Sequence, residues 1–169
     1  MECDPKEVVG GKGMFRLTDH IEGVEVRSLQ KHEDERGWLS ELYRTDEWDH
    51  RVALCYLSWT QPGKARGPHE HLYQSDYFAF LGPGMLRLYL WDAREESKSH
   101  LDRMRLDVGA DNPVVVLVPP RVVHAYKCIS DQKGLVVNLP NKLYAGEQRK
   151  HEVDEIRHED REDTPFSLD

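Results

Sequence analysis

Cysteine is scarce in this chain of 169 residues, and its three cysteines form no closely spaced pair. Cys3, Cys55 and Cys128 are odd in number and lie far apart in the sequence. A disulfide framework needs paired cysteines and a thiolate zinc site needs them at short spacings, so neither is indicated. We therefore expect reduced thiols and a cytoplasmic protein.

Long apolar runs are absent as well. The N-terminal region contains no apolar segment of the kind found in a signal peptide. No stretch approaches the roughly 18 apolar residues that are needed to span a bilayer. We expect neither export through a signal peptide nor insertion into a membrane.

Positive charge is in deficit, because 23 lysines and arginines face 31 aspartates and glutamates, for a formal net charge of −8. An acidic protein of this kind is unsuited to non-specific binding of nucleic acid or of an anionic membrane. Basic side chains gathered at one place must therefore hold any anionic ligand.

Sustained helical periodicity is also missing, and only the N-terminal region and residues 46–50 are candidates for a helix. Short β-rich runs separated by turn residues recur instead, which is typical of a sandwich or barrel formed by one domain. Residues 1–20 are expected to form an N-terminal extension, and residues 146–169 a charged tail that folds back on the barrel. The expected strands are residues 23–29, 38–44, 52–59, 77–81, 85–91, 101–106, 114–118, 125–129 and 135–139.

Gly82-Pro83-Gly84 lies between two of these runs and is typical of a tight turn. The sequence therefore predicts a hairpin in which the strand carrying His71 and Asp76 lies antiparallel to the strand carrying Tyr89 and Trp91. Alternating aromatic side chains are expected to fill the barrel interior. These aromatics are Phe78, Phe80, Tyr89, Trp91 and Tyr126.

Side chains that can carry chemistry gather in residues 66–76. On a strand, His69 and His71 would point to the same side about 7 Å apart, while Glu70 would point away. Two surface histidines at an exposed strand end are the ordinary interpretation of such a pair. His124, which ends a second apolar run, favours instead a shared ligand, proton or metal.

Four short blocks lie in order at residues 34–41, 66–69, 119–125 and 142–147. They resemble the DxRGxxxE, RGxH, PPGxxHG and DYYxPExE motifs of the dTDP-4-dehydrorhamnose 3,5-epimerase family of the cupin superfamily. The resemblance implies an all-β cupin double-stranded β-helix, or jelly roll, in a homodimer whose subunits exchange N-terminal strands. It also implies an isomerase that needs no cofactor and acts on a nucleotide sugar.

Inverting a carbon beside a ketone requires a base, a donor to the enolate oxygen and an acid on the opposite face. The resemblance assigns the base to His69, the acid to Tyr144 and the orientation of His69 to Asp160. Each residue has a second interpretation. His69 fits a metal ligand, Tyr144 fits aromatic packing over the barrel mouth, and Asp160 fits a solvated charge.

The chemistry of other side chains suggests residues that bind the substrate. Arg66, Arg36 and Lys127 are candidates for the pyrophosphate, since basic side chains bind phosphate oxygens, although a single arginine is more often a surface charge. Glu41 is a candidate acceptor for a sugar or base group. In a strand-exchanged dimer, Arg36 and Glu41 of one subunit would reach the nucleotide of the other.

Two positions depart from the family. Asp76 stands where the family has a lysine that stabilises the enolate oxygen, and His71 replaces a glutamine. A carboxylate cannot stabilise an oxyanion unless it is protonated or holds a cation. Either His71 or His124 then donates to the enolate oxygen, or a divalent ion polarises the ketone.

These departures leave other functions open. His69, His71, Asp76 and His124 approximate the three-histidine, one-carboxylate set of metal-binding cupins. A metal-dependent cupin oxygenase or isomerase is therefore the alternative function, and a non-catalytic sugar-binding cupin is a third. A member of the family that inverts only one carbon, or that acts on another nucleotide sugar, also fits the sequence.

Overall fold

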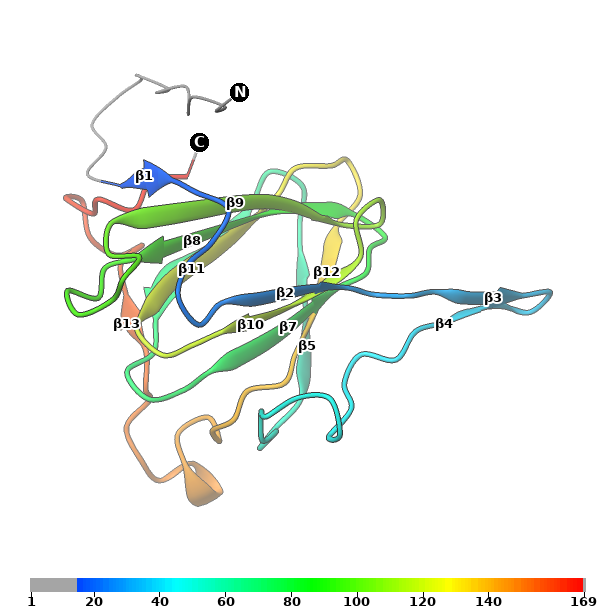
Figure 1. Ribbon diagram of the computed structural model, residues 1–169, viewed down its shortest axis with the longest axis horizontal. Helices are drawn as coiled ribbons and strands as arrows, with labels where there is room; N and C mark the ends of the chain where they lie inside the picture. The colour runs from blue at the N-terminus through cyan, green and yellow to red at the C-terminus, as the bar shows by residue number, and fades with distance from the viewer. Residues whose placement is uncertain (1–14, 169) are drawn as a thin grey trace, which may run out of the picture.

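Two β-sheets packed face to face form the body of the protein, and the computed structural model describes residues 15–168 (Figure 1). The first sheet has six strands in the order β1 (Arg16–Leu17), β9 (Asp102–Gly109), β8 (Met85–Asp92), β11 (Val122–Cys128), β6 (Ala65–Glu70) and β13 (Ile156–Arg157). The second has five strands in the order β2 (Glu25–Ser28), β10 (Val114–Val118), β7 (Asp76–Phe80), β12 (Gly134–Asn138) and β5 (Tyr56–Thr60).

The predicted all-β class is confirmed. Neighbouring strands within the two sheets are antiparallel, apart from the parallel pair β1 and β9. The described residues contain a single short 3-10 helix, η1 (Glu147–Arg149), and residues 46–50 form no helix. Among residues 15–168, no helix is long and apolar enough to cross a membrane.

The main apolar core lies between the two sheets. It draws on both of them, including Phe78, Phe80, Leu88, Leu90 and Tyr126. Because side chains alternate along a strand, Tyr89 and Trp91 of β8 face away from this core. They form a second buried cluster with Phe166 on the outer face of the six-stranded sheet. The expectation that Tyr89 and Trp91 fill the barrel interior was therefore wrong.

The C-terminal segment returns to the six-stranded sheet. Its strand β13 pairs with β6 so that Arg157 lies opposite His69. Further along, the Phe166 ring packs on Trp91 with 5.6 Å between ring centroids. The segment therefore borders the strand that carries His69. Residues 1–14, which make up most of the predicted N-terminal extension, lie outside the described residues.

The turn at residues 82–84 connects β7 to β8, which belong to different sheets. The predicted hairpin is therefore wrong, and His71 lies between β6 and β7 rather than on the strand of Asp76. Gly82 has a φ of +100°, and a Cβ there would lie 2.9 Å from Ala110. Glycine thus permits a sharp turn that takes the chain from one sheet to the other. The same glycine and proline residues are typical of the turn of a hairpin, so the sequence does not distinguish the two.

A small hairpin, which we call the arm (residues 32–39), stands apart from both sheets. Its strands β3 (His32–Asp34) and β4 (Gly37–Leu39) pair antiparallel, and Figure 1 shows the arm projecting beyond the body. Every residue of the two strands is exposed, including Trp38 and Leu39. The strand predicted over residues 38–44 ends early, because Leu42 and Tyr43 turn back to pack on the five-stranded sheet.

Candidate active site

Three histidines converge at one end of the sandwich. His69 on β6 lies directly opposite His124 on β11, and their ring centroids are 4.5 Å apart. His71, one residue beyond β6, lies 5.7 Å from each of the other two rings. One ring nitrogen from each histidine lies within 4.8 Å of the others. The strand pairing thus assembles a cluster that no single sequence segment contains.

Asp76 joins two of these histidines from the facing sheet. Its carboxylate is buried, with Oδ2 3.1 Å from Nε2 of His71 and 3.3 Å from Nε2 of His124. The second oxygen, Oδ1, accepts hydrogen bonds from Gln74 Nε2 at 2.9 Å and Asn138 Nδ2 at 2.8 Å. Burial raises the pKa of Asp76, but hydrogen bonds and charges from His124 and His71 outweigh it and hold the pKa well below its usual range.

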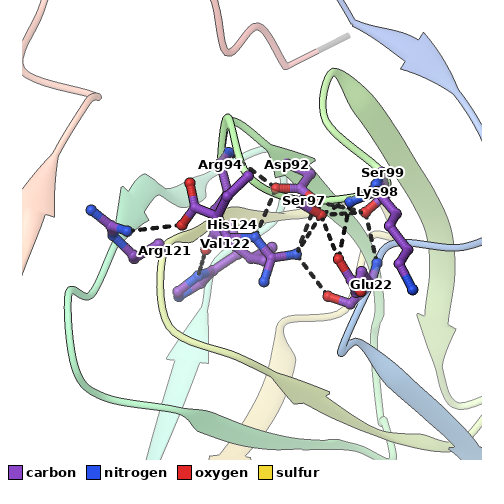
Figure 2. Close-up of polar contacts among 10 residues, drawn as sticks. Glu22, Asp92, Arg94, Ser97, Lys98, Ser99, Arg121, Val122 and His124 are labelled. Atoms are coloured by element: carbon purple, nitrogen blue, oxygen red, sulfur yellow. Dashed lines mark hydrogen bonds and ion pairs between the residues drawn. The ribbon is translucent and has the colours of Figure 1, made fainter.

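Backbone carbonyls hold the far sides of two rings. Nδ1 of His71 bonds to the carbonyl of Asp154. Nδ1 of His124 bonds to the carbonyl of Val122 at 3.1 Å, as Figure 2 shows. Burial lowers the pKa of His71, but the Asp76 carboxylate more than offsets this and raises it above the usual value. Nε2 of His124 is buried and makes no well-aligned hydrogen bond to any described residue.

His69 differs from the other two histidines, because its ring makes no hydrogen bond within residues 15–168. Burial, followed by the charges of His124 and His71, lowers the pKa of His69 to about 2. The ring is therefore a neutral imidazole at physiological pH, which is the form that accepts a proton.

A cavity of about 1130 Å³ opens beside His69. Its walls come from β5, β6, β11 and the segment of residues 140–159. Aromatic side chains line it, among them Tyr56, Tyr73, Phe78, Tyr126 and Tyr144. Four basic side chains line it as well: Arg66, Lys142, Arg149 and Arg157. Four acidic side chains, Glu152, Asp154, Glu155 and Glu159, line it too, and Arg157 pairs with Glu155 at 2.9 Å. A cavity with this lining can hold a large ligand that has a ring, and individual basic side chains must bind any negative charge that the ligand carries.

A buried polar network fixes the end of the neighbouring strand β8 (Figure 2). Asp92 accepts hydrogen bonds from the hydroxyls of Ser97 and Ser99, both at 2.6 Å, and from Arg94 Nε at 2.8 Å. Burial raises the pKa of Asp92, but the hydrogen bonds from Arg94 and the two serines outweigh it and lower the pKa to about 2. Asp92 lies opposite Val122, so the network steadies β11 two residues before His124.

Several residues predicted from the sequence meet at the cavity. Arg66, His69, His71 and Tyr144 all line it, and His124 lies behind His69. Arg66 also donates to the carbonyl of Trp59 at 2.9 Å, which holds its guanidinium at the cavity wall. Tyr144 is 57% exposed and comes from the loop after β12.

Asp160 is not brought to His69. The backbone N–H groups of His158 and Glu159 both donate to the carbonyl of Pro68, which turns the chain at the end of β13. Glu159 lines the cavity as a result, whereas Asp160 is exposed and does not line it. The predicted pairing of Asp160 with His69 is therefore absent from the described structure.

Three further candidates lie outside this cavity. Lys127 follows the inward-facing Tyr126 on β11, so it points to the outer face of the sheet. Arg36 sits at the tip of the arm with 84% of its side chain exposed and pairs with Asp34 at 2.5 Å. Glu41 is exposed and pairs with Arg44 at 3.3 Å. Within one subunit, none of the three contributes to the cavity wall.

Sequence reasoning missed the residues that hold the histidines. Asn138 is a buried polar residue on the apolar strand β12, and that position is a signal that could have been read. Asp154 had no such signal in its charged segment. Its carboxylate accepts hydrogen bonds from the backbone N–H groups of residues 72–74, which fixes the loop after His71.

Comparison with known proteins gives the same fold and a family. A dTDP sugar isomerase from Desulfovibrio desulfuricans G20 superposes with a TM-score of 0.76 at 22% identity, covering 87% of this chain and 91% of that one. This likeness confirms the jelly-roll fold predicted from the sequence.

Two curated proteins are similar in sequence. The probable low-salt glycan biosynthesis epimerase Agl13 of Haloferax volcanii is 35% identical over 74% of this chain and 81% of its own length. The spore coat polysaccharide biosynthesis protein SpsL of Bacillus subtilis is 33% identical over 76% and 85%. The model of one family, described as dTDP-4-dehydrorhamnose 3,5-epimerase, matches residues 18–162. The chain thus belongs to the dTDP-4-dehydrorhamnose 3,5-epimerase family and is a sugar epimerase.

Proposed function

We propose that this enzyme inverts one or both of the carbons that flank the 4-ketone of a dTDP-linked 4-keto-6-deoxy sugar. The observation that carries the proposal is the placement of His69, a neutral imidazole without a hydrogen-bond partner among residues 15–168, on the wall of a large cavity. A ring in this state is suited to remove a proton from carbon. Membership in the epimerase family supports the choice of reaction.

In the proposed reaction, His69 takes the proton from a carbon beside the ketone, and the electron pair of the broken C–H bond moves to the ketone oxygen. The negative charge of the resulting enolate favours the imidazolium, which offsets the low basicity of His69 before substrate binds. Tyr144 then returns a proton to the same carbon from the opposite face. A protonated phenol suits this step because its ordinary pKa is near 10.

The four basic side chains of the cavity wall are proposed to bind the diphosphate. Arg66 is the strongest of these candidates, since it lies three residues from His69 and its guanidinium is already held at the cavity wall. Lys142, Arg149 and Arg157 add positive charge around the same opening. Because four carboxylates line the same cavity, the proposal depends on these individual side chains and not on an excess of positive charge.

The working form is proposed to be a homodimer in which the arms are exchanged. The arm projects from its own subunit and exposes Trp38 and Leu39, two large apolar side chains that a second subunit would cover. Arg36 at its tip would then reach the nucleotide of the other subunit, with Glu41 close behind it. The free thiols of Cys55 and Cys128 agree with a cytoplasmic location.

Exchange of substrate hydrogen with solvent tests the proposal directly. Wild-type enzyme in D₂O should place deuterium at the carbon that is inverted, followed by NMR of a dTDP-4-keto-6-deoxy sugar. His69→Asn should reduce that incorporation by at least about a hundredfold while binding of dTDP is nearly unchanged, because the base acts in the transition state. Retention of more than about a tenth of the activity would assign the base to another residue.

A further inference from the structure

Asp76 and the two histidines beside it form a unit that the proposed proton transfers do not explain. Oδ2 of Asp76 faces two ring nitrogens at once, Nε2 of His71 at 3.1 Å and Nε2 of His124 at 3.3 Å. All three side chains are buried or nearly so, with side-chain exposures of 1%, 11% and 2% for Asp76, His71 and His124. Water therefore does little to screen the groups from one another.

The tautomers of both rings follow from their other nitrogens. A backbone carbonyl only accepts hydrogen bonds, so Nδ1 of His71 must donate to Asp154 and Nδ1 of His124 must donate to Val122. A neutral imidazole has one N–H, which leaves Nε2 of each ring with a lone pair. Two lone pairs would then point at a carboxylate oxygen that also carries only lone pairs.

Such an arrangement requires positive charge between the three atoms. One extra proton on His71 would form an ion pair with Asp76 but leave the lone pair of His124 Nε2 facing the same oxygen. A second proton would create two buried imidazolium rings whose centroids are 5.7 Å apart. A single divalent ion supplies the same charge and accepts all three lone pairs at once. Ligand atoms about 2.1 Å from one ion at bond angles near 90–109° are separated by about 3.0–3.4 Å. The two observed separations of 3.1 and 3.3 Å fall in that range.

The surroundings hold these atoms as a metal site requires. Metal-binding histidines usually donate their second nitrogen to a carbonyl or carboxylate, and a ligating carboxylate is usually hydrogen-bonded in turn. His71 and His124 each donate their second nitrogen to a backbone carbonyl. Asp76 is hydrogen-bonded through Oδ1, which accepts from Gln74 and Asn138. Asn138 is itself oriented, because its own Oδ1 accepts from the backbone N–H of Tyr77 at 3.1 Å.

We propose that His71, Asp76 and His124 bind one first-row divalent metal ion, with His69 left free beside it. Two imidazoles and a carboxylate suit Zn²⁺, Fe²⁺, Co²⁺ or Ni²⁺ better than Mg²⁺ or Ca²⁺, which prefer oxygen ligands. In the epimerase reaction the ion would stabilise the enolate oxygen while His69 removes the neighbouring proton. That role rests on the proposed function, whereas the binding of the ion does not.

The test measures metal binding without any substrate. Protein purified without added metal should contain close to one first-row metal ion per chain by plasma mass spectrometry. After removal of the metal with dipicolinate, titration with Co²⁺ should produce visible d–d absorption that saturates at one equivalent. Asp76→Asn and His124→Asn should each lose most of the bound metal and weaken Co²⁺ binding at least tenfold.

Two control variants separate this site from other histidines. His69→Asn should keep the metal, since His69 is not a ligand in the proposal. His100→Asn removes a histidine of the loop between β8 and β9, outside the cluster, and it should also keep the metal. Far-ultraviolet circular dichroism of each variant identifies any loss that comes from misfolding.

Wild-type protein that contains no metal and gives no saturable Co²⁺ spectrum would overturn the proposal and leave protons on the histidines as the balancing charge. Loss of the metal in a folded His69→Asn variant would overturn the division of roles. Neither result depends on finding the substrate. Absence of deuterium exchange in metal-loaded enzyme would instead count against the proposed function alone.

Discussion

His69 and Tyr144 reach the cavity from different parts of the chain, His69 from β6 and Tyr144 from the loop that follows β12. If Tyr144 returns the proton on the far face, Tyr144→Phe should leave deuterium exchange largely intact, because His69 can still remove and replace a proton from its own side. Net inversion should fall by about a hundredfold or more. An NMR time course in D₂O that follows exchange and product configuration together checks this. Full retention of inversion would remove Tyr144 from the mechanism.

Asp92 provides a residue-level test of stability. Its pKa is about 2 in the folded protein and 3.8 in an unfolded chain, so its ionised form stabilises the fold above pH 4. The sign follows from linkage, because the unfolded state binds the proton more readily and this stabilisation is lost as the pH falls from about 4 to about 2. Asp92→Asn should therefore lower the free energy of unfolding by about 2 kcal/mol at pH 7. Urea denaturation at pH 7 and pH 2.5 should show that the difference shrinks in acid.

At the residue level, local patterns predicted the three clustered histidines better than the side chains that hold them. His69 and His71 follow from an alternating segment, and His124 follows from the end of an apolar run. Asn138 carried a signal as a polar residue on an apolar strand, but Asp154 did not, because its role depends on long-range contacts with the backbone N–H groups of residues 72–74. The predicted pairing of Asp160 with His69 is absent for a related reason. The chain turns where His158 and Glu159 bond to the carbonyl of Pro68, and this turn brings Glu159 to the cavity instead of Asp160.

Among the elements, the C-terminal segment has the clearest structural role. Phe166 covers Tyr89 and Trp91 on the outer face of the six-stranded sheet, and β13 borders the strand of His69. Phe166→Ala should lower the free energy of unfolding by about 3 kcal/mol, since it removes a buried aromatic ring. Chemical denaturation measures this effect, with the exposed Val153→Ala as a control that should change the free energy by less than about 0.5 kcal/mol. Equal stability of the two variants would mean that the segment is not docked in solution.

Most strands of the two sheets were predicted from apolar runs and turn residues, but β6, which carries His69, was not among the expected strands. The partners of the strands were not predicted. The turn at residues 82–84 illustrates the reason. Its glycines and proline fit a hairpin and a corner equally well, and only the pairing of β7 with β10 and β12 decides between them. Such pairings join segments that lie far apart in the sequence. The residues of the turn alone therefore do not determine which strands pair.

For the whole molecule, the position of the arm raises the question of whether each active site contains residues of both subunits. Arg36 lies at the tip of a projecting hairpin and outside the cavity of its own subunit. If the arm is exchanged, each site combines His69 of one subunit with Arg36 of the other. Arg36→Ala should then raise KM for the nucleotide sugar far more than it lowers kcat, because a diphosphate contact is made equally in the ground and transition states.

Mixed dimers distinguish an exchanged arm from an arm that serves its own subunit. A dimer with one Arg36→Ala subunit and one His69→Asn subunit, isolated with two different affinity tags, has one complete site if the arms are exchanged. It should show about half of the wild-type kcat with a wild-type KM, although each parent homodimer is defective. If Arg36 acts within its own subunit, the only site with His69 lacks Arg36, and the raised KM persists. Analytical ultracentrifugation must first find a dimer, since a monomer with a wild-type KM would contradict the exchanged site altogether.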